Sequence, residues 1–136
     1  MFEIFEHTAD LGLRVRAEDR ESLFAEAGRG LLSVIAAEPE QVRPSREVTI
    51  QIQGTELDYL LFDWLNELLF KFETERLLLV EFDVRITAEG LVATARGEPF
   101  DPERHELEHE VKAITYHQLK VEQTPQGWLA EVILDI

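Results

Sequence analysis

The sequence predicts an α+β fold, a two-layer sandwich in which two amphipathic helices pack on a mostly antiparallel β-sheet. Two segments have apolar residues at helical spacing, and roughly six others alternate apolar and polar residues as half-buried strands do. Of the 136 residues, 45% are hydrophobic, which is enough to form a core. We therefore expect a single folded domain over residues 1–136 and no disorder.

The first helix is predicted from Arg20 to Ala37. Asp19 is a suitable N-cap, because its carboxylate accepts a hydrogen bond from the first turn. Pro39 ends the helix, and Gly28 and Gly30 inside it indicate close backbone packing. The apolar residues of its buried face are Leu23, Phe24, Ala27, Leu31, Val34 and Ile35.

The second helix follows Gly54, with Thr55 as its predicted cap and Asp58 three residues on in a box-like arrangement. Its broad apolar stripe is formed by Leu57, Leu60, Leu61, Trp64, Leu65, Leu68, Leu69 and Phe72. This stripe is best explained as core.

The remaining apolar segments alternate and predict strands. The expected strands are 2–5 and 13–17 around a break at 7–12, then 46–53, 80–86, 91–97, 111–123 as one long or bent strand, and 128–136. Glu89-Gly90 is typical of a short hairpin turn.

Charge is the strongest compositional signal. Thirteen basic and 28 acidic residues give a net charge of −15, which opposes direct nucleic-acid binding and favours basic proteins and cations as partners. Solubility alone explains the charge equally well. There is no cysteine, no basic leader segment and no apolar run long enough to span a membrane, so we expect a cytoplasmic protein without disulfides or thiolate metal sites.

Two short segments place oxygen ligands at predicted strand ends. Asp10, in His7-Thr8-Ala9-Asp10, could bind a hard cation, or it could only hydrogen-bond within a turn. At the other end of the chain, Asp135 lies beside the carboxylate of Ile136, and two adjacent anions repel each other. A cation or basic side chain would relieve this repulsion, whereas a frayed terminus would need neither.

Two further segments contain histidine. The spacing of His105 and His109 would put both rings on one helical face and suit zinc, but nearby prolines favour a solvated acidic loop. In residues 110–117, Lys112 is predicted to form an ion pair and His117 to be hydrogen-bonded at a sheet edge. No nucleophile elbow, P-loop or dinucleotide fingerprint is present, so nothing here predicts a catalytic nucleophile.

Four segments in this order resemble the archease family, from near the first residue to the last. They are His7-Thr-Ala-Asp10, Trp64-Leu-Asn-Glu-Leu-Leu69, Glu110-Val-Lys-Ala-Ile-Thr-Tyr-His117 and Val132-Ile-Leu-Asp-Ile136. The third segment and the terminal Asp-Ile are the most specific, and Gly97-Glu98 also fits.

The resemblance implies a non-catalytic accessory protein of the RtcB-type RNA ligase in tRNA splicing and RNA repair. Such a protein promotes guanylylation of the ligase and its multiple turnover, whereas GTP and manganese belong to the ligase. By matching motif, the ligands of a divalent cation would be Asp10, Asp135 and the main chain of Ile136.

Oxygen donors of this kind suit calcium, magnesium or manganese. We expect the acidic tip formed by Asp10, Asp135 and Ile136 to enter the mouth of the ligase active site. Three alternatives stay open: a stand-alone metal-dependent hydrolase, a general chaperone or modulator of nucleic-acid-processing enzymes, and an RNA-binding module that the charge argues against.

Overall fold

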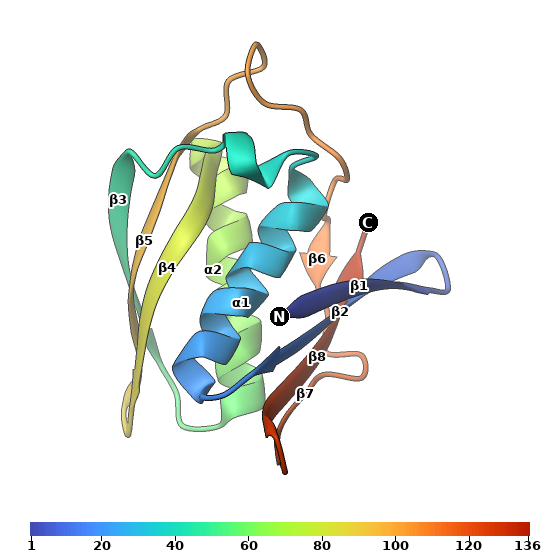
Figure 1. Ribbon diagram of the computed structural model, residues 1–136, viewed down its shortest axis with the longest axis vertical. Coiled ribbons are helices and arrows are strands. Elements are labelled where there is room, and N and C mark those ends of the chain that lie inside the picture. The colour runs from blue at the N-terminus through green and yellow to red at the C-terminus, as the bar shows by residue number, and fades with distance from the viewer.

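The computed structural model describes residues 1–136 and places two helices between two β-sheets (Figure 1). Every strand pair is antiparallel. The predicted α+β sandwich of two helices and mostly antiparallel strands is confirmed. The strands form two sheets rather than one, because alternation indicates which face of a strand is buried but not which strands pair.

The larger sheet has the order β1-β2-β8-β6, and β7 pairs with β8 on the same side as β6. Its strands are β1 (Phe2–His7), β2 (Asp10–Ala17), β6 (Ala113–Ile114), β7 (Lys120–Thr124) and β8 (Gly127–Asp135). The prediction of one strand over 111–123 is wrong. Only residues 113–114 and 120–124 pair with β8, and the chain between them forms a loop in which Gln118 has a positive φ of 56°.

The smaller sheet has the order β3-β5-β4. Its strands are β3 (Arg46–Gln53), β4 (Leu77–Thr87) and β5 (Gly90–Pro99), and the predicted turn before Gly90 is confirmed. Gly97 of β5 faces the main chain of β4 so closely that a Cβ there would lie 1.7 Å from the Leu78 carbonyl oxygen. The position therefore requires glycine, and it directs the next residue, Glu98, into a buried position.

The helices are α1 (Arg20–Ile35) and α2 (Leu57–Glu75), with a 3₁₀ turn, η1 (Pro39–Gln41), after α1. The predicted cap of α1 is confirmed, because the Ser22 amide donates to Asp19 Oδ1 at 2.7 Å. The predicted Thr55 cap is wrong: Glu56 occupies the N-cap position of α2, and no side chain caps that helix. Neither helix is long and apolar enough to cross a membrane.

The core fills the space between the two sheets and around both helices. Trp64 of α2 is fully buried, and its indole N–H donates to the Phe24 carbonyl of α1 at 2.8 Å. Gly28 lets α1 approach β4, since a Cβ there would lie 2.9 Å from the Phe82 ring. The apolar stripes predicted from helical spacing are thus the faces that the helices bury.

Candidate functional site

The predicted break near the N-terminus is a tight hairpin. His7 of β1 pairs directly with Asp10 of β2, so Thr8 and Ala9 alone form the turn. Ala9, the second central residue of the turn, has a positive φ of 64° whereas Thr8 does not, which is the pattern of a type II turn. Asp10 is therefore the first residue of a regular strand, at the end of the larger sheet.

The strand register brings the two predicted aspartates together. The ladder between β2 and β8 ends with the pair Leu11 and Leu134, so Asp10 and Asp135 are the next residues on the two strands and lie at the same end of the sheet. On its other side, Asp135 pairs with Ala113 of β6, and its carbonyl accepts the Lys112 amide at 2.7 Å. Asp135 is thus held by neighbours on both sides, and the terminus is not frayed up to this residue.

Both aspartates lie on the outer face of the sheet, away from the helices. Leu13 and Leu134 are buried in the core, and side chains alternate along a strand, so Asp10 and Asp135 project from the opposite face. Directly opposed residues have Cβ atoms about 4.5–5.5 Å apart. Both residues are half-buried, and neither carboxylate has a basic side chain within 4.0 Å.

Two histidines extend this row of side chains. The rings of His7 and His117 meet edge to face with centroids 5.3 Å apart, although 110 positions separate them in sequence. His7 Nδ1 is buried and has no hydrogen-bond partner. His117 belongs to the loop after β6, and its main-chain N–H donates to Thr115 Oγ1. Sequence reasoning missed this pairing, whose only signal was a histidine in each of two family-like segments.

Lys112 does not form the predicted ion pair. Its side chain is exposed and lies beyond 4.0 Å of every carboxylate, so that prediction is wrong. The predicted alternation across residues 110–117 also fails, because Val111 and Ile114 are both buried. Because β6 has only two residues, the side chains on either side of it need not alternate between the two faces of a sheet.

The donor set fits a hard divalent cation. It comprises the carboxylates of Asp10 and Asp135 and the main-chain and terminal oxygens of Ile136, all at one end of the sheet. No group of three or more His, Asp or Glu side chains is placed to hold a metal ion. Two side-chain carboxylates alone would leave coordination positions for other oxygens, for water or for a partner.

A second acid–histidine cluster lies in the smaller sheet, at the C-terminal end of β5. Glu98 is buried and accepts a hydrogen bond from the Arg43 amide at 2.7 Å. It also forms an ion pair with Arg104, and its Oε2 lies 3.0 Å from Nε2 of the His105 ring. The Asp101 amide donates to His105 Nδ1 at 2.9 Å, so Nε2 carries the proton and donates to the carboxylate. Both ring nitrogens are thus engaged.

This arrangement argues against the zinc alternative, and it also corrects the favoured prediction of a solvated loop at His105. His105 is buried with both nitrogens hydrogen-bonded, so it is not free to ligate a metal with His109. Burial alone would raise the pKa of Glu98, but hydrogen bonds from Arg104, the Arg43 amide and His105 outweigh it and lower the pKa to about 2. The cluster anchors the loop after β5.

The model of the Archease protein family matches residues 2–136. The chain belongs to the archease family. Among curated relatives, archease from Methanopyrus kandleri is 42% identical over 139 residues, covering 99% of each chain. Archease from Pyrococcus furiosus is 39% identical over 99% of this chain and 98% of its own.

Two solved structures extend the similarity to archease folds. The solution structure of protein 1598 from Methanobacterium thermoautotrophicum has a TM-score of 0.84 and 34% identity, over 99% of this chain and 98% of that one. An archease crystal structure from Thermotoga maritima, described as a possible chaperone, has a TM-score of 0.69 and covers 100% of this chain and 98% of its own. At 23% identity it supports the fold alone.

Proposed function

We propose that this chain is a non-catalytic, cytoplasmic accessory protein of an RtcB-type RNA ligase in tRNA splicing and RNA repair. It promotes guanylylation of the ligase and multiple rounds of RNA joining. It acts through a divalent cation held by Asp10, Asp135 and Ile136. Family membership over residues 2–136 supports the accessory role.

The observation that carries the proposal is the register of β2 and β8. It brings the carboxylates of Asp10 and Asp135 to the same end of the sheet, one residue beyond the last pair of the ladder, and neither has a basic partner within 4.0 Å. Two adjacent unpaired carboxylates repel each other. A fold that is stabilised only by its core has no use for this repulsion, whereas a cation site does.

A bound cation would supply positive charge to phosphate or nucleotide oxygens of the partner at this tip. The residues of this chain fix where that charge is placed. The Lys112 amide, which directly precedes β6, donates to the Asp135 carbonyl, and the hairpin turn holds Asp10. Calcium, magnesium and manganese all accept such oxygen ligands.

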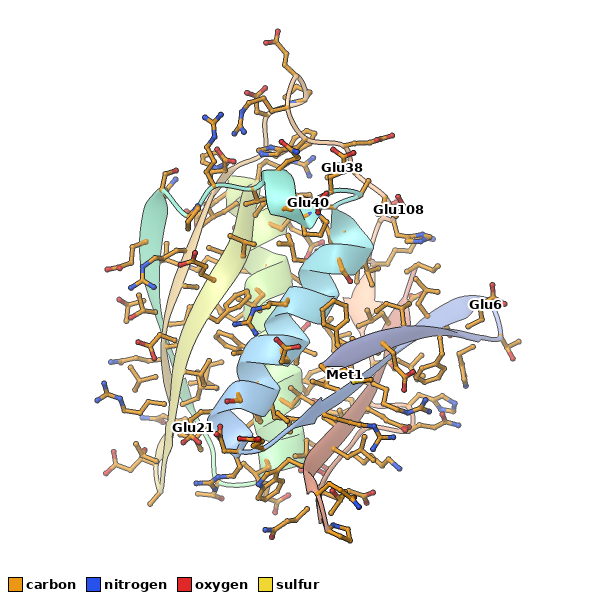
Figure 2. The ribbon with its side chains drawn as sticks, in the orientation of Figure 1. Met1, Glu6, Glu21, Glu38, Glu40 and Glu108 are labelled. Atoms are coloured by element: carbon orange, nitrogen blue, oxygen red, sulfur yellow. The ribbon has the colours of Figure 1, made fainter.

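The charge of the molecule favours a protein partner with a basic surface. The net charge is −15, and acidic side chains project from many parts of the molecule, including Glu6 on the hairpin and Glu38, Glu40 and Glu108 beyond the end of α1 (Figure 2). A ligase that binds RNA presents basic surface, so attraction would speed the encounter. Direct RNA binding by this chain would oppose the same field.

A general chaperone or modulator of nucleic-acid-processing enzymes is the second candidate, because the Thermotoga maritima structure is described as a possible chaperone. A chaperone should act on several client proteins and should not need a metal ion, whereas the ligase activator should act on one ligase and depend on the metal. A stand-alone hydrolase would need a substrate cavity beside the carboxylates. One surface hollow, of about 520 Å³, lies away from these carboxylates, between α1 and β4, where Glu21, Arg29 and Asp83 line it.

The test is ligase guanylylation and multiple-turnover RNA joining with the cognate RtcB-type ligase, GTP and Mn²⁺. Wild type is compared with Asp10→Ala and Asp135→Ala, and Glu6→Gln serves as a matched control. Glu6 is an exposed carboxylate on the same hairpin that forms no ion pair. Each variant must first melt within a few degrees of wild type.

We expect stimulation by wild type and Glu6→Gln and none by the two aspartate variants. Stimulation by all four proteins would leave the accessory role standing without the metal site. No stimulation by wild type, combined with suppression of aggregation of unrelated enzymes, would favour the chaperone instead.

A further inference from the structure

Three aromatic side chains form an exposed cluster between α2 and the loop after β6, which we call the aromatic patch. The ring of Tyr116 stacks on Phe62 with centroids 3.9 Å apart and an interplanar angle of 16°. Tyr59 meets Tyr116 edge to face at 5.8 Å. Tyr59 and Tyr116 are nevertheless 53% and 58% exposed. The cluster is ordered by its own contacts but is not covered.

Exposed aromatics in contact with one another are uncommon on a surface that needs only solubility. Most other large aromatics of this protein are buried or half-buried, as Trp64, Phe24 and Phe82 show, although Phe70 is also exposed. Tyrosines that are already packed lose little side-chain freedom when a partner covers them, which is why such residues dominate binding energy at interfaces. The patch therefore has the character of a preformed docking surface.

The charges around the patch select the chemistry of the occupant. Asp58 precedes Phe62 by four residues and Asp63 follows Tyr59 by four, so a carboxylate lies one helical turn from each aromatic of α2. No lysine or arginine occurs from residue 47 to residue 70. Aromatic faces flanked by carboxylates favour a guanidinium, which stacks on a ring and pairs with a carboxylate at once.

The patch adjoins the candidate metal site through consecutive residues. Tyr116 faces α2, whereas its neighbour His117 contacts His7, which pairs with Asp10. The loop is tied to β8, since the Thr115 amide and hydroxyl both donate to the Ile133 carbonyl, at 3.1 and 3.0 Å. A partner seated on the patch would therefore lie next to the Asp10–Asp135 end of the sheet.

We propose that the aromatic patch is a docking surface for an arginine-bearing segment of the partner protein, and that docking there positions the partner against the acidic sheet end. This inference rests on the proposed function, because it assigns to the partner ligase a second contact. The patch supplies affinity, and the sheet end supplies the activating group.

The test is isothermal titration of the cognate ligase with wild type, Tyr59→Ala, Tyr116→Ala and Tyr116→Phe. The matched control is Phe70→Ala, since Phe70 is 55% exposed on the same helix but lies about 12 Å along the axis from Phe62. We expect Kd to rise about tenfold or more for the two alanine variants. Tyr116→Phe and Phe70→Ala should stay within about threefold of wild type.

A paired readout separates docking from activation. Asp10→Asn should bind within about threefold of wild type but fail to stimulate, whereas Tyr116→Ala should stimulate fully at saturating concentration. Wild-type affinity in both tyrosine variants, with stimulation intact in wild type, overturns the docking surface alone. No binding by wild type overturns the proposed function and this inference together.

Two more measurements address the identity of the occupant. Octa-arginine should bind wild type more tightly than octalysine, and Tyr116→Ala should lose that difference; equal binding of the two peptides overturns the choice of arginine. Sedimentation should show wild type and Tyr116→Ala at the same mass. A wild-type dimer that this substitution dissociates would show that the patch is a self-interface.

Discussion

Two regions of this protein combine carboxylates with histidine, and they differ in how completely their polar atoms are satisfied. Around Glu98, two carboxylate oxygens receive an amide, a guanidinium and an imidazole, and both nitrogens of His105 are engaged. At the other region, Asp10 and Asp135 follow the last pair of the β2–β8 ladder without a basic partner, and His7 Nδ1 is buried without a hydrogen-bond partner.

The difference separates stability from function. A buried carboxylate whose two oxygens both accept hydrogen bonds from the surrounding protein stabilises one conformation and is poorly placed to bind a ligand. Adjacent carboxylates without a counter-charge cost stability and are retained where a cation or a partner completes them. Residue type does not distinguish the two regions, since each has acids and a histidine; the number of satisfied atoms does.

The largest expected effect is on stability, from Glu98→Gln. Glutamine keeps only one of the two oxygens, so either Arg104, or the Arg43 amide together with His105, would face an NH2 group in place of an acceptor. We expect the free energy of unfolding to fall by roughly 2–4 kcal/mol, measured by urea denaturation. Glu47→Gln is the control, because that exposed carboxylate pairs with Arg96 on the surface and should change stability by less than about 0.5 kcal/mol.

Acid should destabilise the protein through the same residue. The pKa of Glu98 is about 2 when folded and about 4.5 when unfolded, so the unfolded chain binds its proton more readily. The contribution of Glu98 is therefore present above pH 4.5 and is lost as the pH falls towards 2. Thermal melts across this window should show a steeper loss in wild type than in Glu98→Gln, and parallel curves would contradict this.

A smaller and opposite effect is expected at the sheet end. Asp10→Asn removes one of two repelling charges. Without metal, its free energy of unfolding should therefore equal that of wild type or exceed it by about 0.5 kcal/mol or less. Saturating Mn²⁺ should stabilise wild type by about 2–3 kcal/mol at one hundred times Kd and leave Asp10→Asn unchanged. Equal stabilisation of both proteins would show that the cation binds elsewhere.

The smallest expected effect is that of His109→Ala. The His109 main chain donates to Val34, but its ring forms no hydrogen bond, so stability should change by about 0.5 kcal/mol or less. His105→Ala, in the same loop, should cost several times more, because it leaves buried Glu98 without one donor. Similar losses for the two would contradict the assignment of the loop anchor to His105.

The helices could be predicted from local pattern, whereas the site could not. The stripe around Trp64 and the Asp19 cap depend on neighbours within one or two turns. The proximity of Asp10 and Asp135 depends on a register between strands 125 positions apart, and no local spacing encodes it. The family resemblance joined these two residues; from their own segments, a turn and a frayed end explained them as well.

Burial was the other property that local sequence did not reveal. His105 lies in a polar, proline-flanked segment that predicted a solvent-exposed side chain. Its ring is nevertheless buried, because it hydrogen-bonds the buried carboxylate of Glu98. The available signal was Gly97-Glu98, since a glycine at a close strand approach followed by an acid indicates a constrained, buried charge. Thr55 failed as a cap because α2 starts two residues later, at Leu57.

The most direct test of this division is one assay with two variants. RNA joins per ligase molecule are counted at 25 °C, with GTP and Mn²⁺, for wild type, Asp10→Asn and Glu98→Gln, each shown to be folded at that temperature. We predict that Glu98→Gln stimulates turnover like wild type despite its lower stability, and that Asp10→Asn does not stimulate despite its full stability. Full stimulation by Asp10→Asn, together with its loss in folded Glu98→Gln, would place the functional site at the wrong end of the molecule and contradict the account.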